Sequence, residues 1–196
     1  MLLGIGAVGA GAFVVVFLLD GWTRPGYSSV RHPVSALALG SRGWLQTANF
    51  IICGSATCLG AAGVLFAGQS IWLGWVLVVF GLSLAASGIF PMDPMRGYPP
   101  GAPHGDPDTF SRHHTLHDYA GMLVFGTLPA AAAISAVVLP WGMMRIASAA
   151  VAVGLVAGFV AFGRAWESDS PRAGVIQKVM ITAGWLWLAA VFVAFL

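Results

Sequence analysis

Six apolar runs, each close to the length that crosses a lipid bilayer, dominate this sequence. They cover about residues 2–19, 44–66, 70–90, 118–139, 142–162 and 176–196. An α-helix needs roughly 20 residues to span the hydrocarbon core, and only helices and closed barrels satisfy their backbone hydrogen bonds in lipid. The sequence therefore predicts one all-α domain, residues 1–196, built as a single bundle of six transmembrane helices in contact with the lipid bilayer.

The composition excludes other classes of protein. Of the 196 residues, 58% are hydrophobic and only 8% are charged, which is too few to cover a water-soluble globule. The formal net charge of +2 and the absence of basic runs give no indication of a nucleic-acid partner. The first run lacks the basic segment and the cleavage site of a secretory signal, so we expect it to be retained as the first helix.

The connections between the runs alternate in length. Those near residues 68 and 140 are short, whereas 20–43, 91–117 and 163–175 are long and polar. Because successive crossings alternate in direction, all three long connections are predicted to lie on one face of the membrane. Eight of the nine Lys and Arg residues lie there, and the positive-inside rule predicts a multi-pass protein of the cell membrane whose polar loops are cytoplasmic.

Ionisable residues are concentrated between residues 88 and 118. This segment holds four of the seven acidic residues and four of the five histidines. Ionisable groups beside a membrane core are costly to keep there and mark a functional site by default. We therefore expect any chemistry where the long connections meet the helices.

Three carboxylates stand where a helix dipole should repel them. Asp20, Asp93 and Glu167 lie near the C-terminal ends of the first, third and fifth helices. Each is followed by arginine, so ion pairs alone would account for them. The alternative is a site in which apolar surroundings keep one carboxyl protonated. By contrast, Asp118 and Asp169 stand near the starts of the fourth and sixth helices and are predicted to cap them.

Histidines near the start of the fourth helix allow a metal site. His117 lies four residues after His113 and three after His114, so it can share a helical face with either. Together with Asp93 or His104, two such imidazoles would form a zinc site. The HExxH pattern of zinc proteases is absent.

Ser35 follows a histidine and a proline in the first long connection. It would be a nucleophile if His32 or His117 reached its hydroxyl. The simpler interpretation is a serine that caps a short helix.

Four short motifs carry a resemblance to a known family. They read DG at 20–21, HPVS at 32–35, GIFPMD at 88–93 and TLH at 115–117. In these motifs the chain resembles the six-helix bacterial membrane proteins of domain-of-unknown-function family 998. The resemblance implies that Asp20, Ser35, Asp93 and His117 belong to the family pattern, and it implies no reaction. In size and layout the chain is also similar to small actinobacterial membrane terpene cyclases, which close prenylated indoles and related meroterpenoids.

The favoured hypothesis is an acid-initiated terpene cyclase that needs no cofactor. A carboxylic acid would protonate an alkene or open an epoxide of a hydrophobic prenyl substrate, and aromatic rings would stabilise the resulting cation. Asp93 would donate the proton, supported by His117 or His114, and Asp20 or Glu167 would be the second acid or the final base. The residues expected to bind substrate are Trp22, Tyr27, Ser35, Phe90, Arg96, Tyr98, His114, Tyr119 and Trp166.

Two alternatives belong to other classes of protein. One is a metal-dependent hydrolase of a lipid amide or ester, with zinc held by His104, His113 and His117. The other is a transporter or lipid-binding membrane protein without catalysis.

Overall fold

The computed structural model describes all 196 residues and contains six long helices and no β-strand. The helices are α1 (Leu2–Thr23), α2 (Gly43–Phe66), α3 (Ile71–Ile89), α4 (Arg112–Val138), α5 (Met143–Glu167) and α6 (Ala173–Ala194), with a short 3₁₀ helix, η1 (Val34–Ala38), between α1 and α2. All six long helices are long and apolar enough to cross a membrane. The predicted bundle of six membrane-type helices is therefore confirmed.

The ends of the helices differ from the hydropathy runs. α1 and α5 continue past their apolar runs, so Asp20 lies in the last turn of α1 and Glu167 is the last residue of α5. α4 begins earlier than its run, because the hydroxyl oxygen of Ser111 accepts a hydrogen bond from the backbone N–H of His114 (3.1 Å). The histidines at 113, 114 and 117 are thus helical residues.

Both predicted acidic caps are wrong. Asp118 lies inside α4, where its carboxylate is 3.3 Å from Nε2 of His114. Asp169 stands in the turn before α6 with a φ of +46°, and its side chain pairs with Arg31. The N-cap residues of α4 and α6 are Ser111 and Arg172 instead.

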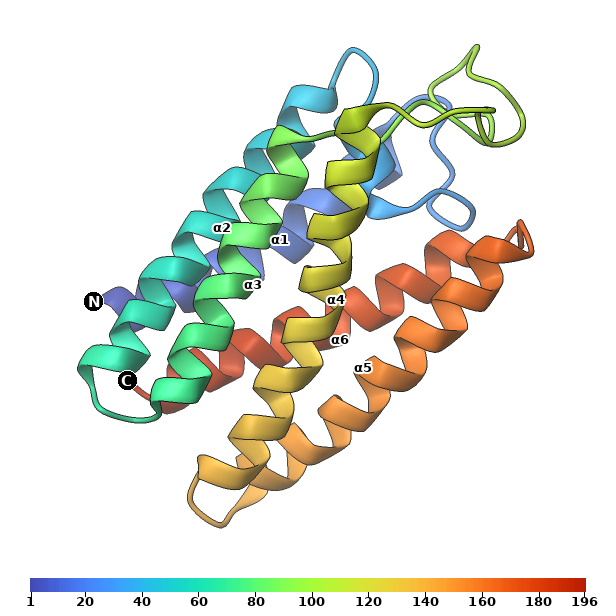
Figure 1. Ribbon diagram of the computed structural model, residues 1–196. Coiled ribbons are helices and arrows are strands. Elements are labelled where there is room, and N and C mark those ends of the chain that lie inside the picture. Colours follow the sequence, from blue (N-terminus) through green and yellow to red (C-terminus); the bar gives the residue numbers. More distant parts are fainter.

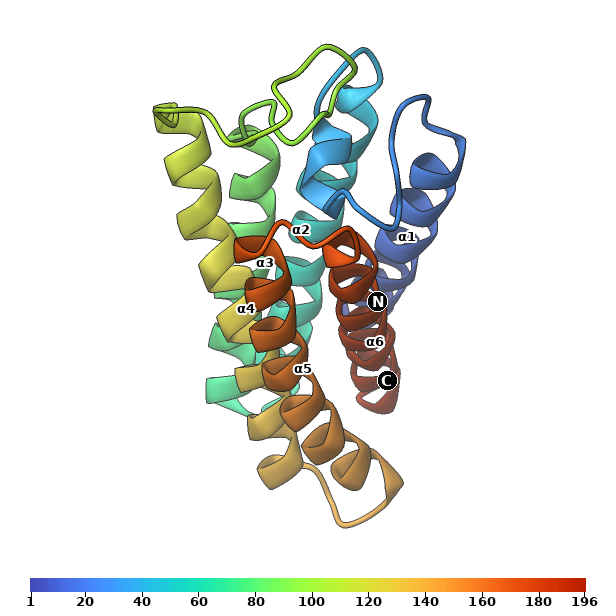
Figure 2. The same cartoon turned by 90° about the vertical axis from the view of Figure 1, so that its right-hand side faces the viewer.

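The long loops and the short turns lie at opposite ends of the bundle, as Figures 1 and 2 show. Within it, α5 packs mainly against α4 and α6 and stands at the margin. In the most apolar 18-residue stretch of α5, only 11% of the residues are buried, whereas 50% are buried in the corresponding stretches of α2, α3 and α6. One side of α4 is therefore covered by a single, loosely packed helix.

Aromatic rings fill the centre of the bundle. Trp185 of α6 is 2% exposed, and its ring stacks on Phe13 of α1 with centroids 4.1 Å apart. Glycines let the helices around this cluster approach closely: a Cβ on Gly6 would lie 2.9 Å from the Cα atom of Gly60. The packed core of α1, α2, α3 and α6 gives the site below rigid walls on one side.

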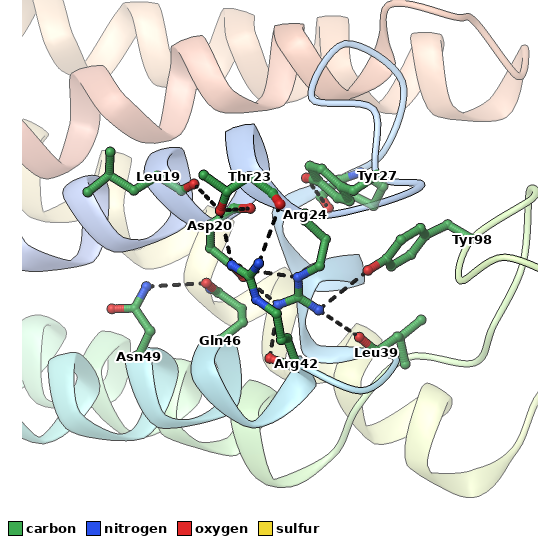
Figure 3. Close-up of polar contacts among 11 residues, drawn as sticks. Leu19, Asp20, Thr23, Arg24, Tyr27, Leu39, Arg42, Gln46, Asn49 and Tyr98 are labelled. Carbon is green, nitrogen blue, oxygen red and sulfur yellow. Dashed lines mark hydrogen bonds and ion pairs between the residues drawn. The ribbon is translucent and has the colours of Figure 1, made fainter.

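A buried carboxylate ties the loops to the helices, as shown in Figure 3. The side chain of Asp20 is fully buried and accepts hydrogen bonds from the guanidinium groups of Arg24 and Arg42. Arg24 also donates to the backbone carbonyl of Leu39 (3.0 Å) and to that of Arg42 (2.9 Å). A small second core beside this network consists of Ala36, Leu39, Met92, Met95 and Tyr98. The loops are therefore folded onto the bundle.

His32 fixes the first long loop against α6. Its Nδ1 accepts a hydrogen bond from the backbone N–H of Ser28 (3.0 Å), and its carbonyl accepts one from Lys178 (2.6 Å). Burial, together with the positive charges of Arg31 and Lys178, lowers the pKa of His32 from its ordinary value of 6.5. The imidazole is therefore held neutral in the fold.

Mild acid is expected to destabilise the protein through His32. A histidine whose pKa is lowered in the folded state favours folding in its neutral form. This contribution is fully present above the unfolded pKa of about 6.5 and is lost as the pH falls below that value. The melting temperature should be measured in detergent between about pH 7.5 and about pH 5.5, on either side of that pKa. As the pH is lowered, it should fall less steeply in His32→Gln than in wild type. Equal slopes for the two proteins would contradict this assignment.

Candidate functional site

A cleft of about 760 Å³ opens between α4 and α5 at the loop end of the bundle. Its walls carry the aromatic side chains of Phe125, Phe159, Phe162 and Trp166. Phe125 stacks on Phe159 with ring centroids 5.2 Å apart. The cleft thus runs between α4 and the marginal helix α5, and it combines these apolar walls with charged side chains, namely Asp106, Asp118, Arg164 and Glu167.

A smaller hollow of about 70 Å³ lies deeper in the bundle. Phe13, Phe50, Leu128 and Trp185 contribute to its apolar wall. Five residues line both spaces: Ser35, His117, Gly121, Phe125 and Gln177. We call this shared set the waist, because it stands where the outer cleft meets the inner hollow.

His117 presents one free nitrogen at the waist. Its Nδ1 lies 2.8 Å from the carbonyl oxygen of Phe90 and 3.2 Å from that of Ser87. Carbonyl oxygens only accept, so Nδ1 must carry the proton. In the neutral ring Nε2 is then an unprotonated acceptor, and it has no hydrogen-bond partner in the protein, although the residue is only 8% exposed.

Ser35 and Gln177 bring donors to the same place. The hydroxyl of Ser35 donates only to the thioether sulfur of Met92 (3.4 Å), a weak acceptor. The side-chain oxygen of Gln177 accepts from the backbone N–H of Val34 (2.8 Å), which leaves the amide NH₂ group without a partner. The waist therefore combines one acceptor, His117, with two available donors.

Asp93 lies outside both spaces and holds Ser111, the N-cap residue of α4. Its carboxylate accepts hydrogen bonds from the backbone N–H (2.7 Å) and the hydroxyl (2.6 Å) of Ser111. Partial burial opposes ionisation, but these bonds and the nearby His114 and His113 outweigh it and lower the pKa of Asp93 from 3.8. The carboxyl is therefore ionised at neutral pH. The predicted contact with His114 runs through the backbone, since Nδ1 of His114 accepts from the N–H of Asp93 (2.9 Å) and stays 3.9 Å from its carboxylate.

The other two anomalous acids are separated from Asp93 and from each other. Asp20 is enclosed by Arg24 and Arg42, and it does not line the cleft. Glu167 lines the mouth of the cleft, is exposed, and has no ion-pair partner. The three acids thus share no hollow.

The structure divides the residues predicted to bind substrate. Ser35, His114 and Trp166 line the cleft. Arg96 and Tyr98 line a separate small space beside His32, where the Arg96 guanidinium lies 3.8 Å from the Trp166 ring centroid. The remaining four, which line neither the cleft nor the hollow, are Trp22 (83% exposed), Tyr119 (67% exposed), Tyr27 and Phe90.

The predicted metal ligands do not converge. His113 is exposed and packs edge-on against Phe90, His104 is exposed, and His117 uses Nδ1 for backbone carbonyls. Nowhere in the chain are three His, Cys, Asp or Glu side chains placed to share a metal ion. The three side chains of the predicted ligand set, His104, His113 and His117, are therefore not brought together in this structure.

Three residues of the waist, Gly121, Phe125 and Gln177, escaped the sequence reasoning. Gln177 and the adjacent Lys178 are buried polar residues of a membrane-type helix, and such residues are candidates for a functional site. Gly121 leaves no such trace, since only the structure shows that a Cβ there would meet no atom within 4 Å. Four of the five waist residues thus lie on α4 and α6, whereas the composition had highlighted the polar loops.

Comparison with known proteins places the whole chain in one group. The family model described as "Protein of unknown function (DUF998)" matches residues 7–194. No curated protein and no solved structure matches the chain. The match extends the resemblance seen in the motifs at 20–120 to nearly the full sequence, and the chain therefore belongs to the DUF998 family of proteins of unknown function.

Proposed function

We propose that this membrane protein is an enzyme that transfers a proton on an apolar small molecule bound in the cleft, with Nε2 of His117 as the base. The observation that carries the proposal is the fixed tautomer of His117. It leaves Nε2 as an acceptor without a partner in the protein, on a residue that lines the apolar hollow. A general base must lie within hydrogen-bond reach of the bound molecule, and His117 lines both the cleft and the hollow.

The surroundings of His117 suit proton abstraction next to a carbonyl or a similar acceptor. Removing such a proton leaves negative charge on the substrate oxygen, and preorganised donors in a dry site stabilise that charge. The amide NH₂ of Gln177 and the hydroxyl of Ser35 are the donors at the waist without a strong protein acceptor. Base and donors come from α4, α6 and η1, so the fold holds them in place.

The substrate is expected to arrive from the lipid. Met122 and Val160 line the cleft within apolar helices and are 59% and 47% exposed. An apolar molecule dissolved in the membrane therefore reaches the cleft without crossing water. Cell-membrane location and cytoplasmic loops remain predictions from the charge distribution.

Terpene cyclisation also begins with a proton transfer and is compatible with this proposal. Its proton donor would then differ from Asp93, the donor that the sequence suggested. The aromatic rings at the waist and in the hollow, Phe13, Phe50, Phe125 and Trp185, would stabilise a carbocation. Asp93 is ionised and bonded to Ser111, the N-cap residue of α4, so a protonated His117 or Glu167 would have to donate the proton. Hydrolysis with Ser35 as nucleophile and His117 as base is the second candidate, favoured by their shared position at the waist.

Closing the waist tests whether the cleft binds such a molecule. Gly121→Leu would place a side chain in the open space between cleft and hollow, because a Cβ there meets no atom within 4 Å. Leucine also favours the helix over glycine by up to about 1 kcal/mol, so the fold should persist. We expect Gly121→Leu to abolish photo-crosslinking of a long-chain ketone that bears a diazirine, measured by mass spectrometry of peptides from α4 and α6.

Gly126→Leu is the matched control for this experiment. Gly126 lies on the same helix, has the same free space around its Cβ, and lines a shallow groove away from the cleft. It should crosslink as wild type does. Undiminished crosslinking of Gly121→Leu, at positions lining the hollow, would contradict the proposed binding site.

A further inference from the structure

The polar groups of the site sit between an apolar inner hollow and a larger outer cleft. Ser35, His117 and Gln177 line the outer cleft and the inner hollow alike. Beyond them the hollow ends on Phe13, Phe50 and Trp185, whose aromatic rings offer no charged group. On the other side Met122, Phe159 and Phe162 give the cleft an apolar wall, and the charged side chains of Arg164 and Glu167 also line it.

This order fixes where the polar group of a ligand can lie. A fatty acid or alcohol with its polar end at the waist would leave one of the two spaces without an apolar group to fill it. If its polar end lay at the mouth of the cleft, the acceptor of His117 and the NH₂ of Gln177 would face methylene groups. Leaving a buried donor or acceptor unpaired costs about 1–3 kcal/mol.

The two spaces also differ in size. The inner hollow measures about 70 Å³ and the outer cleft about 760 Å³. Only a short apolar arm fits past the waist, whereas the outer arm has room for a long or branched chain. Gly121 sets the width of the passage, because any side chain at this position would project into it.

We infer that the ligand is an apolar molecule whose reactive polar group lies inside the chain, a few carbons from one end, with the short arm in the inner hollow. Internal ketones, esters and epoxides have this form. The inference rests on the proposed function and specifies its substrate class. It assigns Gly121 and Val124 as specificity determinants, because Gly121 borders the passage and Val124 lines only the hollow.

A series of ketones of one chain length tests the inference. The ketones differ only in the position of the carbonyl, from the end of the chain to its middle, and a fatty alcohol of equal length serves as the terminal comparator. Each competes with the diazirine ketone for the full-length protein in lipid nanodiscs. We expect the tightest binding for a carbonyl a few carbons from one end, and roughly tenfold weaker binding for the alcohol, since one unpaired buried group costs about 1.4 kcal/mol or more.

Two substitutions on α4 locate the short arm. Val124→Ala enlarges the hollow and should move the optimum toward a longer inner arm, whereas Met122→Ala widens only the cleft and should leave the optimum unchanged. Tightest binding of the alcohol, or an optimum that Met122→Ala moves and Val124→Ala does not, would overturn the inference but leave the proposed cleft intact. Absence of any Gly121-dependent binding would overturn the proposed function as well.

Discussion

Asp20→Asn is expected to lower the free energy of unfolding by about 3–5 kcal/mol, the range found when one partner of a buried ion pair is removed. Asparagine keeps the shape of the side chain but removes the charge that Arg24 and Arg42 share. The Arg24 side chain is only 4% exposed, so its guanidinium would be left buried without a counter-charge. Unfolding in detergent micelles, followed by circular dichroism against denaturant, measures the loss.

Asp169→Asn provides the control for this change. Asp169 pairs with Arg31 through side chains that are 56% and 42% exposed, and such surface pairs contribute about 0–1 kcal/mol. Asparagine also tolerates the positive φ of this position. Similar losses in the two variants would show that Asp20 does not hold the loops in the manner described.

His117→Gln is expected to slow proton transfer by about 10²–10⁴-fold, the usual contribution of a general base. Glutamine can occupy the same space and form hydrogen bonds, but its amide does not take up a proton at neutral pH. The measurement is deuterium incorporation from D₂O at the carbons beside the carbonyl of a bound internal ketone, followed by mass spectrometry. Crosslinking of the diazirine ketone should remain close to wild type, because glutamine fills a space similar to that of His117 and the other residues that line the cleft are unchanged.

Asp93→Asn separates this proposal from the mechanism first suggested by the sequence. Asp93 lies outside the cleft and the hollow, so its substitution should preserve most of the exchange while weakening the start of α4. If Asp93→Asn abolishes exchange in a folded protein and His117→Gln does not, the role assigned to His117 is wrong. Gly126→Leu should match wild type in the same assay.

The bundle was predictable because lipid leaves few choices. Apolar runs of spanning length determine helices, and alternation of direction places the long loops together. Pairing of Asp20 with Arg24, which follows it in the sequence, was one of two alternatives, since a cation offsets a carboxylate at a helix C-terminus. The second partner, Arg42, was not foreseen. Here the interpretation as an ion pair describes the structure, in which Asp20 is enclosed by Arg24 and Arg42.

The site itself depended on contacts that spacing does not reveal. Asp93 and Glu167 share a local sequence pattern, yet one meets Ser111 eighteen residues away and the other stays unpaired at the mouth of the cleft. The tautomer of His117 depends on carbonyl oxygens of α3 and the loop after it. Such distant partners decide which ionisable group is available for chemistry.

The marginal packing of α5 has a consequence for kinetics. If the substrate of the proposed reaction enters from the lipid, the rate depends on the concentration of substrate within the membrane. The volume of the surrounding buffer has little influence on that concentration. Diluting the substrate with inert lipid at constant total amount should therefore lower the turnover, whereas adding buffer should not. Saturation curves for the proposed reaction should therefore be plotted against the mole fraction of substrate in the membrane.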